Sequence, residues 1–457
     1  MCRKYIMGRI YALPEDKMKT IGIDIGTTTI SAVVLETEEE RVLEARTIQN
    51  GSFIKTEHEW EKIQDASMII SKSSAVLDDL LNRYPDTVSI GLTGQMHGIV
   101  YVDGEGSCIS PLYTWQDQRG NLPVFDGASL TARMKDECGA VVSTGYGLVT
   151  HIYQCRRGGV PEGAVRLCTI PDYLGMVLTG RKKPLLHISM AASLGFFDGR
   201  SGSFRVDQLE QLGIDSSILP EVTDDFSVLG FYKGRPVTVA LGDNQASFLG
   251  SVGLKENTVL LNVGTGSQIS VLSDQYFETA GIEARPLTKG KFILVGASLC
   301  GGRAYAIMEK FFRSYASAAG AGECSQYEVM ANLAARDLED DPMKVRTTFN
   351  GTRMDSGLRG SITNLSEDNF TPEGMVRGVL TGIAEELYGM FESIRTGTGI
   401  EAHSLVASGN GVRKNEVLQH IFEEMFGAGL VLARYEEEAA CGAAISSLQG
   451  SRTSSAF

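Results

Sequence analysis

The chain has 457 residues and a net charge of −14, from 42 Lys and Arg against 56 Asp and Glu. Its 43% hydrophobic and 21% charged residues are typical of an ordinary globular protein, which excludes a disordered or collagen-like chain. The acidic balance argues against a nucleic-acid partner, because binding to a phosphate backbone needs clustered Lys and Arg.

Two features of the chain argue against a membrane or exported protein. No stretch approaches 18 consecutive apolar residues, and residues 1–20 mix charges among their apolar residues, unlike a signal peptide. The eight Cys show no C-x-x-C and no zinc spacing, so we expect buried thiols in a reducing compartment. The sequence therefore predicts a cytoplasmic protein that contacts neither membrane nor nucleic acid.

The first predicted element is an apolar strand that carries Asp24 near its end. It leads through the turn Gly26-Thr27-Thr28 into a second strand. About half a chain later the same order returns: a strand with Asn262 near its end, the turn Gly264-Thr265-Gly266, and a strand that begins at Ser267. This repeat indicates a duplicated architecture in which each half contributes one turn to a shared cleft.

The domain organisation follows from this repeat. Apolar runs alternate with helical patterns along the chain, which indicates an α/β fold. At roughly 150 residues per domain the length allows two or three domains. No proline-rich linker separates the halves, so the repeat places the boundary near Leu241 and gives domains over 20–241 and 242–450.

The two Gly-Thr turns are suited to phosphate binding. Each offers successive backbone N–H groups and hydroxyls, and glycine lets phosphate oxygens approach the backbone. One such turn alone would be read as a plain hairpin, but two in register favour a phosphate clamp. Asp24 can hold Mg²⁺ directly or through water, whereas a second carboxylate in place of Asn262 would repel a nucleotide.

Two later stretches place polar groups beside an aromatic ring, as sugar-binding proteins do. Gln95 and His97 come from the first stretch, and Gln116 and Asp117 from the second; all four are candidates to bond sugar hydroxyls. Trp115 would supply a flat apolar wall. The alternatives are a structural His97 and a Trp115 buried in the core.

Asp243 directly follows the apolar strand Val237–Gly242, at the proposed boundary. A carboxylate at the carboxyl end of a strand faces the cleft in open α/β sheets, so Asp243 is the strongest candidate for a catalytic base. The alternative is a simple helix cap.

The C-terminal half contains further turns and helices. Gly301-Gly302 follows the apolar run 292–300, and Pro372–Ser393 is predicted to be a helix capped by Thr371. The loop 407–415, with Gly409-Asn410-Gly411 and Asn415, leads into a predicted helix over Lys414–Phe426. Its small residues would admit a flat ring or a nucleotide sugar, although a plain loop and N-cap explain it equally well.

With these residues assembled, the chain resembles the FGGY family of carbohydrate kinases, within the actin/hexokinase-like ATPase superfamily. The resemblance covers about residues 20–447 and rests on seven motifs: Asp24-Ile-Gly-Thr-Thr28, Gly94-Gln-Met-His-Gly98, Trp115-Gln-Asp117, Gly242-Asp243, Val263-Gly-Thr-Gly266, Gly409-Asn-Gly411 and Cys441-Gly-Ala-Ala444. Within the family, the chain is most similar to the sedoheptulokinases, although xylulokinases share Gln-Met-His-Gly.

The resemblance implies an α/β fold with two ribonuclease-H-like domains flanking a central cleft, and ATP and Mg²⁺ bound in that cleft. It implies that Asp243 is the base, that Met96 and His97 line the sugar pocket, and that Asp24 and Asp243 lie near Mg²⁺. The residues expected at ATP are Gly26, Thr27, Thr28, Gly264, Thr265, Gly266, Ser267, Gly301, Gly302, Gly409, Asn410, Gly411 and Asn415.

The implied reaction is ATP-dependent phosphorylation of a ketose at its terminal primary hydroxyl, with sedoheptulose as the first candidate. The alternatives are xylulose or another ketose and, from a different class, a non-catalytic nucleotide-gated sugar sensor. A chaperone or repressor of this superfamily would need a peptide-binding domain or a DNA-binding helix pair, and the residues outside the motifs are too few for either. A second copy of the chain is a candidate partner.

Overall fold

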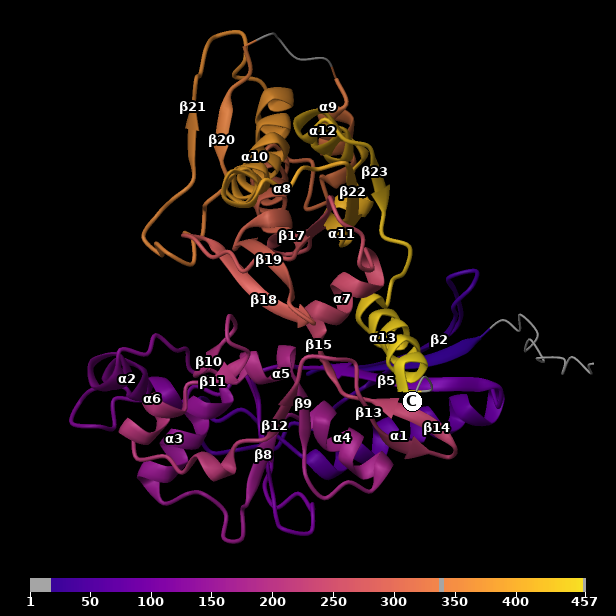
Figure 1. Ribbon diagram of the computed structural model, residues 1–457. Helices are drawn as coiled ribbons and strands as arrows, with labels where there is room; N and C mark the ends of the chain where they lie inside the picture. The colour runs from indigo at the N-terminus through magenta and orange to yellow at the C-terminus, as the bar shows by residue number, and fades with distance from the viewer. Residues whose placement is uncertain (1–17, 337–340, 455–457) are drawn as a thin grey trace, which may run out of the picture.

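Two twisted β-sheets, one above the other, organise the computed structural model, which describes residues 18–336 and 341–454 (Figure 1). The lower sheet has the order β13 (Val228–Tyr232), β14 (Arg235–Thr238), β5 (Thr87–Gly94), β1 (Lys19–Ile25), β2 (Thr29–Glu36), β3 (Arg41–Gln49), with β15 (Leu241–Gly242) paired to β5. Its central strand β1 is buried along most of its length, including Ile21, Ile23 and Ile25.

The upper sheet repeats this arrangement. Its order is β18 (Ile282–Thr288), β19 (Lys291–Ser298), β17 (Ser267–Ser273), β16 (Thr258–Val263), β22 (Ser404–Ser408), β23 (Leu430–Leu432). β16 runs antiparallel to β17 and parallel to β22, as β1 runs antiparallel to β2 and parallel to β5. The duplicated two-lobe architecture predicted from the two Gly-Thr turns is confirmed.

Helices and short strands surround the sheets. In the lower lobe the helices are α1 (Ala66–Arg83), α2 (Leu130–Cys138), α3 (Gly147–Arg157), α4 (Ile170–Thr179), α5 (Ile188–Ser193) and α6 (Val206–Gln211). The upper lobe carries α8 (Gly301–Ala318), α9 (Tyr327–Ala334), α10 (Pro372–Thr398), α11 (Asn410–Arg413) and α12 (Glu416–Phe426). The short strands are β4 (Ile63–Gln64), β6 (Val100–Val102), β7 (Leu112–Tyr113), β8 (Arg166–Cys168), β9 (Leu185–His187), β10 (Phe197–Asp198), β11 (Ser203–Phe204), β12 (Glu221–Thr223), β20 (Lys344–Arg346) and β21 (Ser361–Thr363).

The two helices predicted in the C-terminal half are present with shifted ends. α10 begins at Pro372 as predicted, because the Thr371 hydroxyl accepts the N–H of Gly374. It runs beyond the predicted end at Ser393 and stops at Thr398, before a left-handed Gly399. α12 begins two residues later than predicted, since the short helix α11 and the cap residue Asn415 occupy the positions before it.

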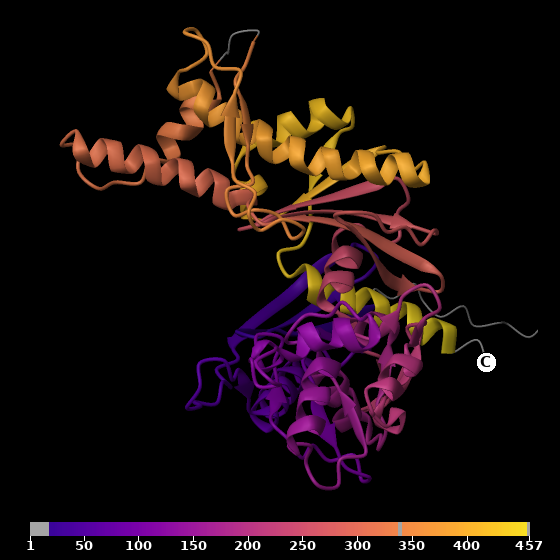
Figure 2. The same ribbon diagram turned by 90° about the vertical axis from the view of Figure 1, so that its left-hand side faces the viewer.

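Two helices join the lobes, α7 (Asp243–Ser251) and the C-terminal α13 (Glu438–Ser454) (Figures 1 and 2). α13 packs against α7 and crosses β1 and β5, so the end of the chain returns to the lower sheet. The close packing explains the small residues of the Cys441–Ala444 motif. A Cβ added to Gly442 would collide with the carbonyl oxygen of Ala246 on α7.

The predicted cytoplasmic location depended on the cysteines and on the absence of a long apolar segment, and the structure describes both features. Cys168, Cys300 and Cys441 are buried free thiols, but Cys155 and Cys324 are exposed, so the prediction of buried thiols is wrong for these two. Cys2 lies outside the described residues. Across the part of the chain that the structure describes, none of the helices is long and apolar enough to span a bilayer.

Candidate active site

Three parallel strands bring acidic side chains to one edge of the lower sheet. In the register of β1, β5 and β15, Asp24 lies beside Thr93, and Thr93 lies beside Leu241, whose carbonyl accepts the Thr93 hydroxyl at 2.9 Å. The carboxyl ends of parallel strands meet at the same edge, and Asp243 follows β15 directly as the first residue of α7. Asp24 and Asp243 are therefore neighbours although they are distant in sequence.

Asp243 is a carboxylate with properties suited to a general base. Burial raises its pKa to about 6, while the backbone N–H of Asn244 and the positive charge of Arg285 oppose that rise. A base with a pKa near the working pH is deprotonated at neutral pH and still accepts a proton readily.

The carboxylate of Asp24 is buried close to two other carboxylates. Burial, followed by the negative charges of Asp243 and Glu437, raises its pKa to about 7. Its Oδ1 atom is buried without a hydrogen-bond partner. A divalent cation would reduce the repulsion between these carboxylates and bond to the oxygen that has no partner. These residues therefore fit a Mg²⁺ site. The sequence analysis missed Glu437, which precedes α13 and reaches Asp24 only because that helix returns to the lower sheet.

The first Gly-Thr turn is held by side chains that we expected at the sugar. The Trp115 Nε1–H donates to the Thr27 hydroxyl at 3.0 Å, and that hydroxyl donates to Gln95 Oε1 at 3.4 Å. The carbonyl of Thr27 accepts Gln64 Nε2–H at 2.9 Å, and that of Gly26 accepts an N–H of Asn50 at 2.8 Å. Trp115 and Gln95 thus brace the turn, and neither lines the cavity between the lobes that is described below.

Asp117 is bonded to protein groups on both of its carboxylate oxygens. Its buried carboxylate accepts the Arg119 Nε–H at 2.7 Å, the Arg119 backbone N–H at 3.0 Å and the Lys62 backbone N–H at 3.1 Å. These bonds fix the loop that carries Trp115. Neither Asp117 nor the neighbouring Gln116 lines the cavity between the lobes.

A polar cavity of about 590 Å³ lies between the lobes, with Asp243 in its wall. Met96 and His97 line it from the lower lobe. Other polar residues that line it are Ser189, Ser193, Tyr146, Arg205, Asn244, Gln245, Gln268, Tyr276, Glu278, Glu283, Arg285 and Arg353. Asn244 and Gln268 bring the lobes together here, through a bond of 3.4 Å from the Asn244 amide to Gln268 Oε1.

His97 is held so that one ring nitrogen can accept a hydrogen bond. Its Nδ1 lies 2.7 Å from the carbonyl oxygen of Ser193, which can only accept, so Nδ1 carries the proton. The ring stacks on Tyr146 with centroids 4.9 Å apart. Burial lowers the pKa of His97, which keeps the ring neutral and leaves Nε2 as an acceptor.

The upper lobe contributes charges that the sequence analysis missed. Glu283 and Arg285 lie on the same face of β18, and Arg285 donates to Glu283 through its Nη2 at 2.7 Å. Arg353 reaches the other oxygen of Glu283 at 3.1 Å. Burial raises the pKa of Glu283, but the two arginines outweigh it and hold the pKa below its usual range. The Glu-Ala-Arg spacing on one strand face was the available signal for this pair.

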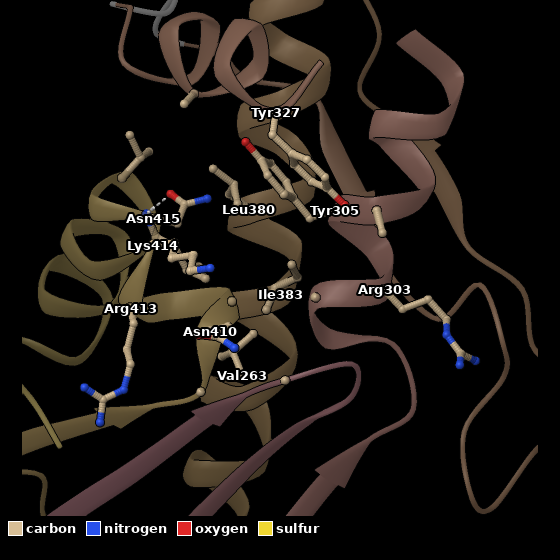
Figure 3. A pocket seen from close by; sticks show the side chains of 18 of the residues that line it. Val263, Arg303, Tyr305, Tyr327, Leu380, Ile383, Asn410, Arg413, Lys414 and Asn415 are labelled. Atoms are coloured by element: carbon tan, nitrogen blue, oxygen red, sulfur yellow. Dashed lines mark hydrogen bonds between the residues drawn. The ribbon is translucent and has the colours of Figure 1, made fainter. Parts of the chain in front are cut away.

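A second cavity, of about 1180 Å³, opens in the upper lobe beside the second Gly-Thr turn (Figure 3). Of the residues predicted at ATP, it is lined by Gly264, Thr265, Gly302, Gly409, Asn410, Gly411 and Asn415. The start of α8 packs on the turn, where the N–H groups of Gly302 and Arg303 donate to the carbonyls of Gly264 and Thr265 at 2.9 and 3.0 Å. Those two N–H groups are therefore committed to the turn.

The remaining residues predicted at ATP have different places. Gly266, Ser267 and Gly301 do not line the second cavity, and Gly301 packs against the carbonyl of Gly266. The first turn, Gly26 to Thr28, lines neither cavity.

Gly409 is the residue that shapes the floor of this cavity. Its φ of +85° and ψ of 151° lie in a region that essentially only glycine adopts. An added Cβ would stand 2.5 Å from the carbonyl oxygen of Val263, at the end of β16. The backbone of the loop thus rests directly against the strand that leads into the turn.

Aromatic and apolar side chains from α8, α9 and α10 form the opposite wall, as Figure 3 shows. The rings of Tyr305 and Tyr327 face each other with centroids 5.8 Å apart, next to Leu380 and Ile383. Tyr327 comes from the segment 315–371, to which the sequence analysis assigned no role. Asn415 lines the cavity and also caps α12, because its Oδ1 accepts the N–H of Leu418 at 3.0 Å.

Comparisons with known proteins identify the family and the fold. Two family models, described as the N-terminal and C-terminal domains of the FGGY family of carbohydrate kinases, match residues 19–250 and 259–448. A sedoheptulokinase from Mus musculus is 28% identical over 94% of this chain and 97% of its own. A xylulose kinase from Staphylococcus xylosus is 26% identical over 96% of this chain and 92% of its own. The crystal structure of xylulose kinase from Rhodospirillum rubrum has the same fold, with a TM-score of 0.78 and 21% identity over 95% of this chain and 90% of that one.

Proposed function

The chain belongs to the FGGY family of carbohydrate kinases and is an enzyme that phosphorylates a sugar, and from this premise we propose that it transfers the γ-phosphoryl group of ATP to the terminal primary hydroxyl of a ketose. Sedoheptulose is the proposed acceptor. The observation that carries the proposal is the position of Asp243, a buried carboxylate at the wall of a polar cavity between the two lobes.

In the proposed reaction, Asp243 accepts the proton of the sugar hydroxyl while its oxygen attacks the γ-phosphorus. The new O–P bond forms as the bond to the β-phosphate oxygen breaks, and ADP leaves. His97 Nε2 and the charged pair Glu283–Arg285 are placed to hold the other hydroxyls. Most of the acceleration in such reactions comes from positioning and charge stabilisation, with about 10² to 10⁴ from the base.

We place ATP in the upper cavity, with its phosphates directed between the two Gly-Thr turns. The turn at Gly264 and Thr265 already lines that cavity. The turn at Gly26 to Thr28 is fixed by its four bracing side chains and would contact the phosphates once the lobes close. Closure of the lobes would also exclude water, which otherwise accepts the phosphoryl group.

Mg²⁺ is part of this proposal, with Asp24 and Asp243 as the residues beside it. The ion would neutralise phosphate charge on ATP. Throughout residues 18–336 and 341–454, no group of three or more His, Cys, Asp or Glu side chains forms a metal cage. A Mg²⁺ held by one or two carboxylates, with water and phosphate as its other ligands, needs no such cage.

The choice of sedoheptulose is supported by the likeness to sedoheptulokinases, and the cavity of about 590 Å³ offers polar groups from both lobes for a sugar's hydroxyls. Xylulose is the alternative, supported by the xylulose kinase relative. The test is ADP release from Mg-ATP with sedoheptulose, xylulose, ribulose, fructose and glycerol. The highest kcat/KM with sedoheptulose supports the proposal, and a higher value with another sugar refutes that choice.

The variant Asp243→Asn tests the base. It should lower kcat by about 10² to 10⁴ with nearly unchanged ATP binding. Asp172→Asn is the matched control, because Asp172 is also a buried carboxylate in the first turn of a helix and burial raises its pKa to about 8. Since Asp172 is already protonated at neutral pH, its amide variant should keep wild-type turnover. Wild-type turnover in Asp243→Asn would remove that residue from the role.

A further inference from the structure

Helix α5 lies between the strand that leads to Asp243 and the loop that carries His97. It is a single short element, Ile188–Ser193, and it contacts β15. Its first and last turns each carry one buried serine, Ser189 and Ser193, and both line the sugar cavity. The two serines bond to the backbone of different parts of the site.

Ser189 holds the residue immediately before the base. The N–H of Gly242 donates to Ser189 Oγ at 3.0 Å. His187 Nδ1 accepts the Ser189 backbone N–H at 3.2 Å, so Nδ1 carries no proton and must also accept the Ser189 hydroxyl, 2.8 Å away. The hydroxyl therefore points its proton at His187 and its lone pair at Gly242. Burial lowers the pKa of His187 to about 3, so this direction does not change at working pH.

Ser193 holds the sugar-binding histidine. Its Oγ accepts the His97 backbone N–H at 3.0 Å and donates to the carbonyl of Met190 at 2.7 Å. Its carbonyl accepts the His97 Nδ1–H. His97 has a φ of +71°, a conformation that a non-glycine residue adopts only where its surroundings hold it. The bonds from Ser193 hold both its backbone and its ring, and the ring also stacks on Tyr146.

We propose that Ser189 and Ser193 are positioning residues that fix Asp243 and His97 from the two ends of α5. This inference rests on the proposed function, in which Asp243 is the base and His97 binds the sugar. Ser189 sets the direction in which the carboxylate leaves β15, and Ser193 sets the direction of His97 Nε2. A single helix thereby keeps the base and one sugar contact at a fixed separation.

The two serines should affect different kinetic constants. Ser189→Ala leaves the Gly242 N–H buried without an acceptor and should lower kcat about tenfold, with the sugar KM changed less than about twofold. Ser193→Ala removes one of the two bonds that hold His97 and should raise the sugar KM about five- to tenfold, with kcat changed less than about twofold. The ATP KM should stay unchanged in both variants.

The experiment measures kcat per nucleotide-binding site, titrated with a fluorescent nucleotide, so that loss of folded protein does not count as loss of turnover. Ser447→Ala is the matched control. Ser447 is a buried serine bonded to Ser89 at 2.8 Å, between α13 and β5, and lines neither cavity. Ser447→Ala should change the melting temperature and leave kcat and both KM values unchanged.

The outcomes separate this inference from the proposed function. The inference is supported if Ser189→Ala lowers mainly kcat and Ser193→Ala raises mainly the sugar KM, while Asp243→Asn lowers kcat by at least about 10². If Asp243→Asn is inactive but both serine variants keep the wild-type constants per site, or change only their melting temperature as Ser447→Ala does, the inference is refuted and the proposed function stands. If Asp243→Asn keeps wild-type turnover, the proposed base and the role of Ser189 are both overturned.

Discussion

Replacing Asp24 by Asn should stabilise the ligand-free protein at pH 8. Burial and the charges of Asp243 and Glu437 raise the Asp24 pKa from 3.8 to about 7. The folded state thus binds this proton more tightly than the unfolded chain does, so stability is lost as pH rises from about 4 through 7. A shift of about three pK units corresponds to about 4 kcal/mol, at about 1.4 kcal/mol per unit.

The amide removes the charge but replaces one oxygen by a buried N–H₂ group, and burying these donors without an acceptor costs about 2 kcal/mol. The expected net gain is therefore about 2 kcal/mol. For a lobe of this size, that gain raises the melting temperature by about 4 to 8 °C. Differential scanning calorimetry without nucleotide or metal, at pH 8 and pH 5, measures it.

The pH dependence is what makes this prediction specific. At pH 5 Asp24 is already protonated in the folded protein, so the gain from Asn should shrink well below its value at pH 8. Asp274→Asn, at a side chain that is 66% exposed, is the control and should change the melting temperature little. The electrostatic argument is refuted if Asp24→Asn melts at or below the wild type at pH 8, or gains equally at both pH values. Because the variant lacks the carboxylate that we propose beside Mg²⁺, adding Mg-ATP should stabilise the wild type more than the variant.

Two further substitutions test the remaining parts of the site. Gly409→Ala would need a glycine-only conformation and would press on the Val263 carbonyl, so the ATP KM should rise at least about tenfold while the sugar KM stays constant. Gly427→Ala, at a φ of +63° with open space around it, is the matched control and should leave the ATP KM unchanged. Arg285→Gln removes a positive charge that lowers the pKa of Asp243, so kcat measured against pH should lose activity at a higher pH than in the wild type. An unshifted acid limb would show that Arg285 does not act on the base.

Much of the fold could be predicted from local sequence because local forces decide it. The helix start at Pro372 depends on Thr371 and Gly374, which are neighbours in the chain. The Gly-Thr turns and the apolar strands before them are also local, and their repetition half a chain apart predicted the two sheets. Asp243 could be placed at a strand end for the same reason, since the apolar run before it marks that end.

The partners of individual side chains could not be predicted this way. Trp115, Gln95 and Asp117 have the residue types of a sugar site, but the fold uses Trp115 and Gln95 to brace the first turn and Asp117 to bind Arg119. A tryptophan N–H or a buried carboxylate bonds to whatever donor or acceptor long-range packing brings to it. Which partners meet depends on the packing of the whole lobe, so no local sequence pattern indicates them.

The sequence by itself determined the α/β class, the two Gly-Thr turns and the family, because each is encoded in residues close together in the chain. Only the tertiary structure decided which residues face the cavities. It brought Arg285 and Arg353 across from the upper lobe, and it returned α13 to the lower sheet so that Glu437 lies near Asp24. Charges that lie so far apart in the sequence interact only in the folded protein, where the loss of chain entropy has been offset. Local sequence patterns therefore do not indicate these contacts.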